Sequence, residues 1–169
     1  MIVALLKYLH LAAMLCWCAS LIALPLLLSL YGGAWRRDRG SEKLQARYAE
    51  FRLITHYGYV AFATPAAVIA IAAGTGLIFA ADIFDLWFVA KLALVSGMAL
   101  VHAWIGHFIL VSAEHRGMQN LPSPLIPLAL AIPLMVGVLW LVLAKPDLGG
   151  LTDWMPRFML SPRGTWGQA

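Results

Sequence analysis

Four long apolar runs dominate the pattern of hydrophobic and polar positions along the chain. Each is at least about 20 residues long, which is the length that an α-helix needs to cross the hydrocarbon core of a bilayer. The runs cover approximately residues 3–31, 57–81, 86–113 and 123–144. Prolines lie within or near the ends of several runs, and membrane helices tolerate proline better than soluble helices do. The pattern predicts an all-α protein, an integral membrane bundle of four transmembrane helices.

Composition supports a membrane protein and divides the chain into two parts. Hydrophobic residues make up 62% of the 169 residues, charged residues make up 12%, and the mean hydropathy is +0.82. A soluble domain of this size needs more polar surface. We therefore expect a transmembrane domain over residues 1–146 and an irregular tail rich in glycine, proline and aromatic residues over 147–169. The first run is too long for the apolar core of a signal peptide, so we expect it to be a retained span.

The excess of positive charge gathers in the loop after the first run. The formal charge is +4, and this loop holds Arg36, Arg37, Arg39, Lys43, Arg47 and Arg52. The positive-inside rule puts the loop in the cytoplasm and both termini on the outer, periplasmic side. The basic charge therefore reflects membrane orientation, and no nucleic-acid partner is expected. Residues 41–51 could form a short helix lying on the membrane surface.

Two ionisable side chains lie in the outer half of the predicted bundle. Such residues are costly inside a span, and they usually face the bundle interior with a partner. His10 lies about two turns into the first run and Lys91 about one turn into the third, counted from the same side, so we expect similar depths. His10 could be a structural hydrogen-bonding group or a ligand, most often of haem iron in a helical bundle. Lys91 could extend toward the headgroups or pair with a carboxylate of a cofactor or substrate.

Three further histidines lie toward the inner side. His102 and His107 are about 140° apart around a helix, so one iron is not expected to bind both. His56 enters the second run from the cytoplasmic side and could approach the depth of His107. The bundle then has two layers of polar groups, and a cofactor would satisfy several of them at once. Candidate ligands of a metal or cofactor are His10, His56, His102 and His107.

Short motifs in the four runs resemble a known family. The first run has Lys7, His10, Trp17 and Leu24-Pro25. The second has Thr64-Pro65-Ala66 and Gly74 to Gly76, and the third has Trp87, Lys91, Leu92 and His102. The last run closes on Lys145-Pro146. In order and spacing, residues 4–146 resemble the HemJ-type protoporphyrinogen IX oxidases and the related CopD-like membrane proteins.

The resemblance implies a small helical protein of the bacterial inner membrane that binds haem b. By position, His10 would be the first haem ligand, and Lys91 and His102 would be further site residues, with Lys91 as the catalytic candidate. One or two haems are expected, depending on whether the inner histidines form a second site. The chain departs from the family pattern after Leu24-Pro25, where leucine replaces the usual arginine. The missing arginine weakens the case for binding the carboxylates of a porphyrinogen.

Four functions remain open at this level. The first is haem-linked electron transfer, with a quinone or other subunits of a respiratory complex as partners, or as a homo-oligomer. The second is protoporphyrinogen oxidation coupled to quinone. The third is copper handling, for which Met14, Cys16 and Cys18 are soft donors that fan around one helix. The fourth is a structural or assembly subunit without a cofactor. We favour the first.

Overall fold

The computed structural model describes residues 1–37, 42–81, 86–114, 123 and 125–144, and all of them except Met1 and Ser123 are helical. The elements are α1 (Ile2–Arg37), α2 (Glu42–Tyr57), η1 (Gly58–Ala63), α3 (Thr64–Ala81), α4 (Leu86–Glu114) and α5 (Leu125–Ala144). Within these residues, four helical stretches are long and apolar enough to cross a membrane: Ile2–Leu30, Glu50–Ala80, Val89–Val111 and Leu125–Ala144. The prediction of an all-α, four-helix membrane bundle is confirmed.

The outer surface of the bundle is apolar along the spans. Between 22% and 39% of the most apolar part of each span is buried inside the protein, so most of its side chains face outward. Large apolar side chains such as Leu15, Phe62, Phe79, Leu100 and Leu143 are exposed. Helices that are apolar on all sides are typical of membrane spans. The exposed side chains are therefore in contact with membrane lipid.

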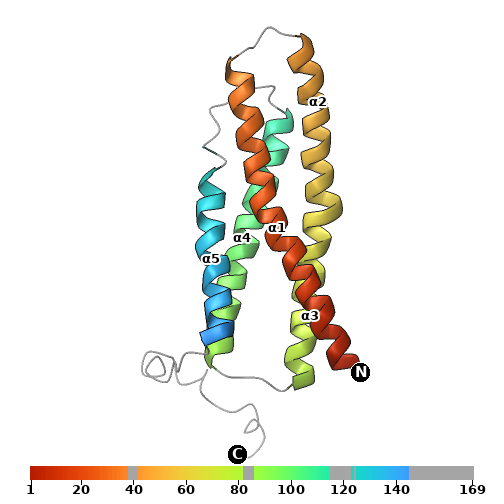
Figure 1. Ribbon diagram of the computed structural model, residues 1–169, viewed down its shortest axis with the longest axis vertical. Helices are drawn as coiled ribbons and strands as arrows, with labels where there is room; N and C mark the ends of the chain where they lie inside the picture. The colour runs from red at the N-terminus through yellow and green to blue at the C-terminus, as the bar shows by residue number, and fades with distance from the viewer. Residues whose placement is uncertain (38–41, 82–85, 115–122, 124, 145–169) are drawn as a thin grey trace, which may run out of the picture.

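Helix α2 continues into the second span instead of lying on the membrane surface. Figure 1 shows α2 and α3 as one column, and the backbone stays helical through η1, a π-helical segment between them. The segment ends before Pro65, which has no N–H and whose ring would crowd the carbonyl four residues earlier. In η1 the N–H of Thr64 donates to the carbonyl of Tyr59, five residues back, which widens the turn. The expectation of a separate surface helix over 41–51 is wrong.

The bundle consists of two helix pairs. Helix α1 packs most extensively on α3, and α4 packs on α5 (Figure 1). The buried face of η1 and α3 is built from alanines, which let two backbones approach closely: Ala63 of η1, and Ala66, Ala67, Ala70 and Ala73 of α3. The α4–α5 pair packs differently: Leu134 of α5 lies against Gly97 of α4, and Leu94 of α4 lies against Gly137 of α5.

Helix α1 joins the two pairs, since it also contacts α5 and α4. Its fully buried Trp17 and Leu21 form the centre of the core with Met98 and Ile105 of α4. Over their described residues, α3 and α4 have no extensive contact of their own. The candidate site lies where these two helices stand apart.

Candidate functional site

A cavity of about 260 Å³ lies between α1, α3 and α4. Its walls are mainly apolar, with side chains from Met14 and Trp17 on α1, Ile71 and Leu77 on α3, and Leu92 on α4. Among the described residues, the ionisable groups on its walls are Lys7, His10 and Lys91. An apolar cavity with a few polar groups is the usual form of a small-molecule site. His10 and Lys91, expected at similar depth, line this one cavity.

The imidazole of His10 is held by a backbone carbonyl of the neighbouring helix. Its Nδ1 lies 2.8 Å from the carbonyl oxygen of Ala70, and because a carbonyl only accepts, Nδ1 carries the proton and donates. Within the described part of the chain, Nε2 makes no hydrogen bond. A neutral imidazole with Nδ1–H bonded to a carbonyl presents Nε2 as the acceptor or metal-binding atom. His10 is therefore oriented as a ligand-binding histidine would be.

Gly74 makes room for this imidazole. A Cβ atom at position 74 would lie 2.9 Å from Cε1 of His10 and 3.2 Å from its Nδ1, closer than side chains tolerate. Gly74 is one helical turn after Ala70. The Ala70 carbonyl that bonds the imidazole and the glycine that leaves space for it therefore lie on the same face of α3. The pair Ala70 and Gly74 thus forms the seat of His10.

Two lysines line the same cavity. Lys7 is exposed, and Lys91 is half-buried. Lys7 lies one turn before His10 on α1, while Lys91 extends from α4. Ammonium groups at the edge of an apolar cavity favour a ligand that carries carboxylates.

His102 lies outside the cavity, in a cluster with aromatic and hydroxyl groups. Its ring stacks on Tyr59 with centroids 4.7 Å apart and planes at 19°. The ring of Trp17 meets it edge-on, with centroids 6.1 Å apart and planes at 81°. Trp17 also lines the cavity, and His102 does not. The two histidines that the family resemblance groups together therefore sit in separate surroundings.

Both hydroxyls of this cluster are engaged. The Thr64 hydroxyl donates to the carbonyl of Tyr59 at 3.0 Å, so its oxygen accepts from Nε2–H of His102, 3.4 Å away. The Tyr59 hydroxyl donates to the backbone carbonyl of His102 at 3.3 Å. It fills the space where a Cβ at Gly106 would be. His102 is thus fixed by packing and hydrogen bonds to η1 and α3, as a structural histidine is.

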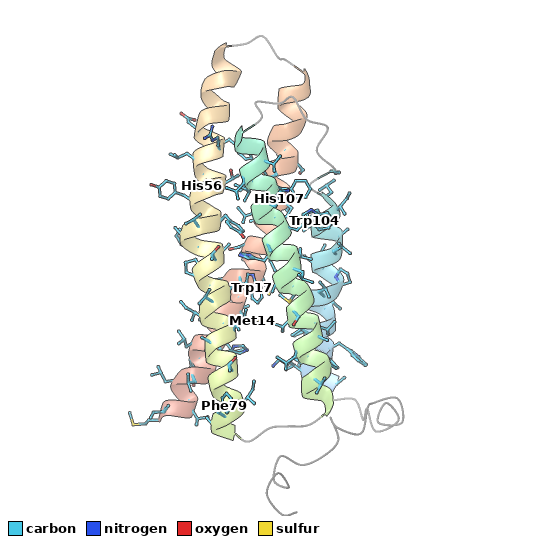
Figure 2. The ribbon with its side chains drawn as sticks, turned by 180° about the vertical axis from the view of Figure 1, so that it is seen from behind. Met14, Trp17, His56, Phe79, Trp104 and His107 are labelled. Carbon is cyan, nitrogen blue, oxygen red and sulfur yellow. The ribbon has the colours of Figure 1, made fainter. Side chains whose placement is uncertain are left out.

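The sequence leaves open a second histidine pair, formed by His56 and His107 at similar depth. Figure 2 shows them at similar height on α2 and α4, which agrees with the expected similar depth. Both side chains are exposed, however, and neither lines the cavity. Among the described residues, no group of three or more His, Cys, Asp or Glu side chains gathers as a metal site.

The soft donors of α1 do not share one environment. Met14 lines the cavity and is half-buried, whereas Cys16 is exposed and Cys18 is half-buried on another side of the helix. Copper(I) is held by thiolate and thioether ligands that converge on it. These three residues fan around the helix as the sequence predicts.

Three features of the site were not predicted from the sequence. The carbonyl of Ala70 and the small size of Gly74 seat the imidazole of His10, and no periodicity marks either residue. The third is the indole Nε1–H of Trp17, which is buried and has no hydrogen-bond partner among the described residues. A lone tryptophan in an apolar run gives no signal of this kind. Comparison of the chain with protein-family models, curated proteins and solved structures finds no match.

Proposed function

We propose that this membrane protein binds haem b in the cavity and takes part in electron transfer. The observation that carries the proposal is the hydrogen bond from Nδ1 of His10 to the Ala70 carbonyl, which leaves Nε2 as the ligating atom beside an apolar cavity. This arrangement is the usual one for a histidine that binds a metal, since the second-shell carbonyl fixes both the tautomer and the ring orientation.

The other cavity residues fit the same group. The apolar side chains of Met14, Trp17 and Leu92 would surround a porphyrin ring and keep water from it. Lys7 and Lys91 would hold propionate groups at the cavity edge. The haem itself would supply one-electron chemistry, and burial and the axial ligand would set its potential. A cavity with one histidine among its described residues corresponds to one haem bound there per chain.

The membrane setting suggests the partners. We place the chain in a bacterial inner membrane with the basic α1–α2 connection in the cytoplasm, so that the cavity lies toward the periplasmic side. A quinone is the natural electron carrier within lipid. Other subunits of a respiratory complex, or a second copy of the chain, would pack against part of the exposed apolar surface of the bundle. Accessibility of single cysteines placed at residues 2 and 40 to a membrane-impermeant maleimide, in intact cells, tests the orientation.

A second candidate function is oxidation of protoporphyrinogen coupled to quinone. It is favoured by Lys91, which together with Lys7 puts two ammonium groups on one apolar cavity that also holds a histidine. In this function Lys91 would bind a substrate carboxylate. Porphyrinogen turnover by the purified protein, monitored by porphyrin fluorescence with a quinone analogue present, distinguishes it from electron transfer alone.

The experiment that tests haem binding is a spectrum of the purified protein. The protein, expressed in a haem-producing bacterium and purified in detergent, should give a b-type reduced-minus-oxidised spectrum. A pyridine haemochrome assay should count one haem per chain. Two haems per chain would contradict the single site proposed here, and loss of one of them in His56→Ala or His107→Ala would assign the second site to these residues. A flat spectrum after expression with added haem precursor would refute the proposal.

A further inference from the structure

The cavity is open on one side, between α3 and α4. Three residues of these helices that line it are also exposed at the surface of the bundle: Ile71 and Thr75 of α3 and Leu92 of α4. Over their described residues, α3 and α4 make no extensive contact that would cover this side. Figure 2 shows Met14 and Trp17, which line the cavity from α1, between the two helices. The three exposed residues therefore form the rim of a side opening.

The side opening lies within the membrane-spanning part of both helices. Ile71 is about two and a half turns from the end of the second span at Ala80, which is roughly 13 Å at the rise of an α-helix. Leu92 is about one turn from the start of the third span at Val89. The hydrocarbon core of a bilayer is about 30 Å thick, so the opening extends from below the headgroups to near the middle of the membrane. It therefore faces lipid chains.

The rim of the side opening is apolar. Ile71 and Leu92 have hydrocarbon side chains, and 45% and 46% of their surface is exposed. The hydroxyl of Thr75 donates to the carbonyl of Ile71 at 2.8 Å, within α3. This bond satisfies the hydroxyl where no water is at hand and leaves the methyl group for contact with a neighbouring molecule. A rim of this kind suits a molecule that is dissolved in the membrane.

Along the membrane normal, the cavity has a basic end and an apolar end. Lys7 lies near the start of α1 and Lys91 about one turn into α4, and these two helix starts lie at the same end of the bundle (Figure 1). Met14 and Trp17 line the cavity two to three turns further along α1. Ammonium groups bind anions, and apolar walls gain free energy by covering hydrocarbon. The cavity therefore matches an amphipathic acid whose carboxylate points toward the membrane surface.

We propose that the cavity takes up amphipathic acids directly from the membrane, through the side opening. The ligand enters from lipid between α3 and α4, and its carboxylate binds at Lys7 and Lys91. An opening into lipid also lets a molecule larger than the cavity of about 260 Å³ keep part of its apolar body in the membrane. The proposal concerns the route and the chemical class of the ligand, so it goes beyond the proposed haem binding and does not require it.

Photo-crosslinking tests the class of ligand. The full chain is synthesised cell-free into lipid vesicles without haem, so that haem does not compete for the cavity. The probe is a long-chain fatty acid with a diazirine near the middle of its chain, at mildly alkaline pH, and the control probe is the corresponding alcohol. The acid should label Met14 about ten-fold more than the alcohol, which is the effect of one charge-assisted hydrogen bond.

Labelling of Leu143 corrects for the amount of each probe in the membrane, since this side chain is exposed and does not line the cavity. Mass spectrometry locates the labelled residues. Equal labelling of Met14 by acid and alcohol, or no labelling by the acid, would overturn the assignment of the ligand class.

Removing the two ammonium groups tests their part in binding. In Lys7→Met combined with Lys91→Met, the long side chains are kept and the charges are lost. The acid should then lose its preference over the alcohol at Met14, while labelling of Leu143 stays the same. A preference that persists in this variant would show that the lysines do not bind the carboxylate.

A bulky side chain at the rim tests the route. Leu92→Trp should narrow the side opening and lower the labelling of Met14 by the acid several-fold. Leu100→Trp is the matched control, because Leu100 is exposed on the same helix and does not line the cavity. Equal labelling of Met14 in the two variants would contradict entry between α3 and α4.

An accessibility measurement keeps the route test independent of a bulky variant. With Cys16 and Cys18 replaced by alanine, a nitroxide attached at Thr75→Cys should collide more often with oxygen, which dissolves in lipid, than with a water-soluble nickel chelate. A nitroxide at Ile2→Cys, at the end of α1, should show the opposite order. If the label at residue 75 prefers the nickel chelate, the opening faces water and the proposal is wrong. A haem-free spectrum of the purified protein would refute the proposed function and leave these results unaffected.

Discussion

His10 and His102 are both half-buried histidines in the membrane interior, yet their surroundings differ in kind. His10 meets one polar partner, the Ala70 carbonyl, and otherwise faces a cavity. His102 meets the Thr64 hydroxyl, the ring of Tyr59 and the edge of Trp17. Each imidazole has one ring nitrogen in a hydrogen bond, and of the two residues only His10 lines the cavity.

The difference shows that burial of a histidine in a span does not by itself indicate a ligand. A polar group in lipid must find a partner, and His102 finds its partners on η1 and α3. For His10, the hydrogen bond to the Ala70 carbonyl fixes the orientation of the ring. Substitutions around His10 and around His102 should therefore separate the proposed haem binding from stability. Trp17 lies at the boundary, because it lines the cavity and packs against the ring of His102.

The largest effect is expected from His10→Ala. Removing the imidazole that lines the cavity should abolish the proposed haem binding, because the axial ligand is lost, and the folded bundle should remain. Haem content per chain by pyridine haemochrome is the measurement. His107→Ala is the control, since that side chain is exposed and should be neutral. Normal haem content in His10→Ala would mean that the haem is bound elsewhere.

Gly106→Ala tests the packing around His102. Its Cβ would overlap the hydroxyl end of Tyr59, so the ring must move away from His102. We expect a loss of about 2 kcal/mol in the free energy of unfolding, as for overpacked cores. Unfolding in mixed detergent micelles measures it, with Gly58→Ala as control, where a Cβ would be 3.5 Å from Leu24. Loss of haem at unchanged stability would contradict the separation of the two regions.

Gly74→Ala addresses the seat of His10. Displacing the ring from the Ala70 carbonyl should weaken haem affinity roughly ten-fold, the lower range for losing a second-shell contact. Gly76→Ala on the same helix is the matched control, because its Cβ would lie 3.7 Å from the Leu6 side chain, an ordinary contact distance. Competition with a haem-scavenging apoprotein gives the affinities. Identical affinities in the two variants would show that the Gly74 contact does not position His10.

The smallest effect is expected from Thr64→Val, which keeps the side-chain shape and removes the hydroxyl shared by His102 and Tyr59. The expected loss is about 1 kcal/mol in the free energy of unfolding, with haem content unchanged. Thr75→Val is the comparison, because its hydroxyl bonds only the carbonyl of Ile71 within α3. If Thr75→Val is as destabilising as Thr64→Val, the cluster around His102 contributes nothing beyond local backbone bonding.

Part of the candidate site could be predicted from the sequence. Counting residues from the ends of the apolar runs put His10 and Lys91 at similar depth, and they share a cavity. The same count could not show that His102 turns away from that cavity. Its direction depends on Tyr59, which lies in a π-helical segment that shifts the register of the helix.

What the sequence by itself determined is the class of the protein. Apolar runs of membrane-spanning length predict helices that cross a bilayer. In lipid, a single segment can satisfy all of its backbone N–H and C=O groups only as a helix. The bounds of the four spans therefore agree with the runs to within a few residues, except that the second begins earlier, at Glu50.

What only the tertiary structure decided is which side of each helix faces its neighbours. Helices that are apolar all round carry no stripe that marks the buried face. In this bundle, small residues at the contacts, such as Ala70 and Gly74, set how α3 turns toward α1. That rotation fixes which nitrogen of His10 is hydrogen-bonded to Ala70, because directional packing between helices is a property of the assembled bundle.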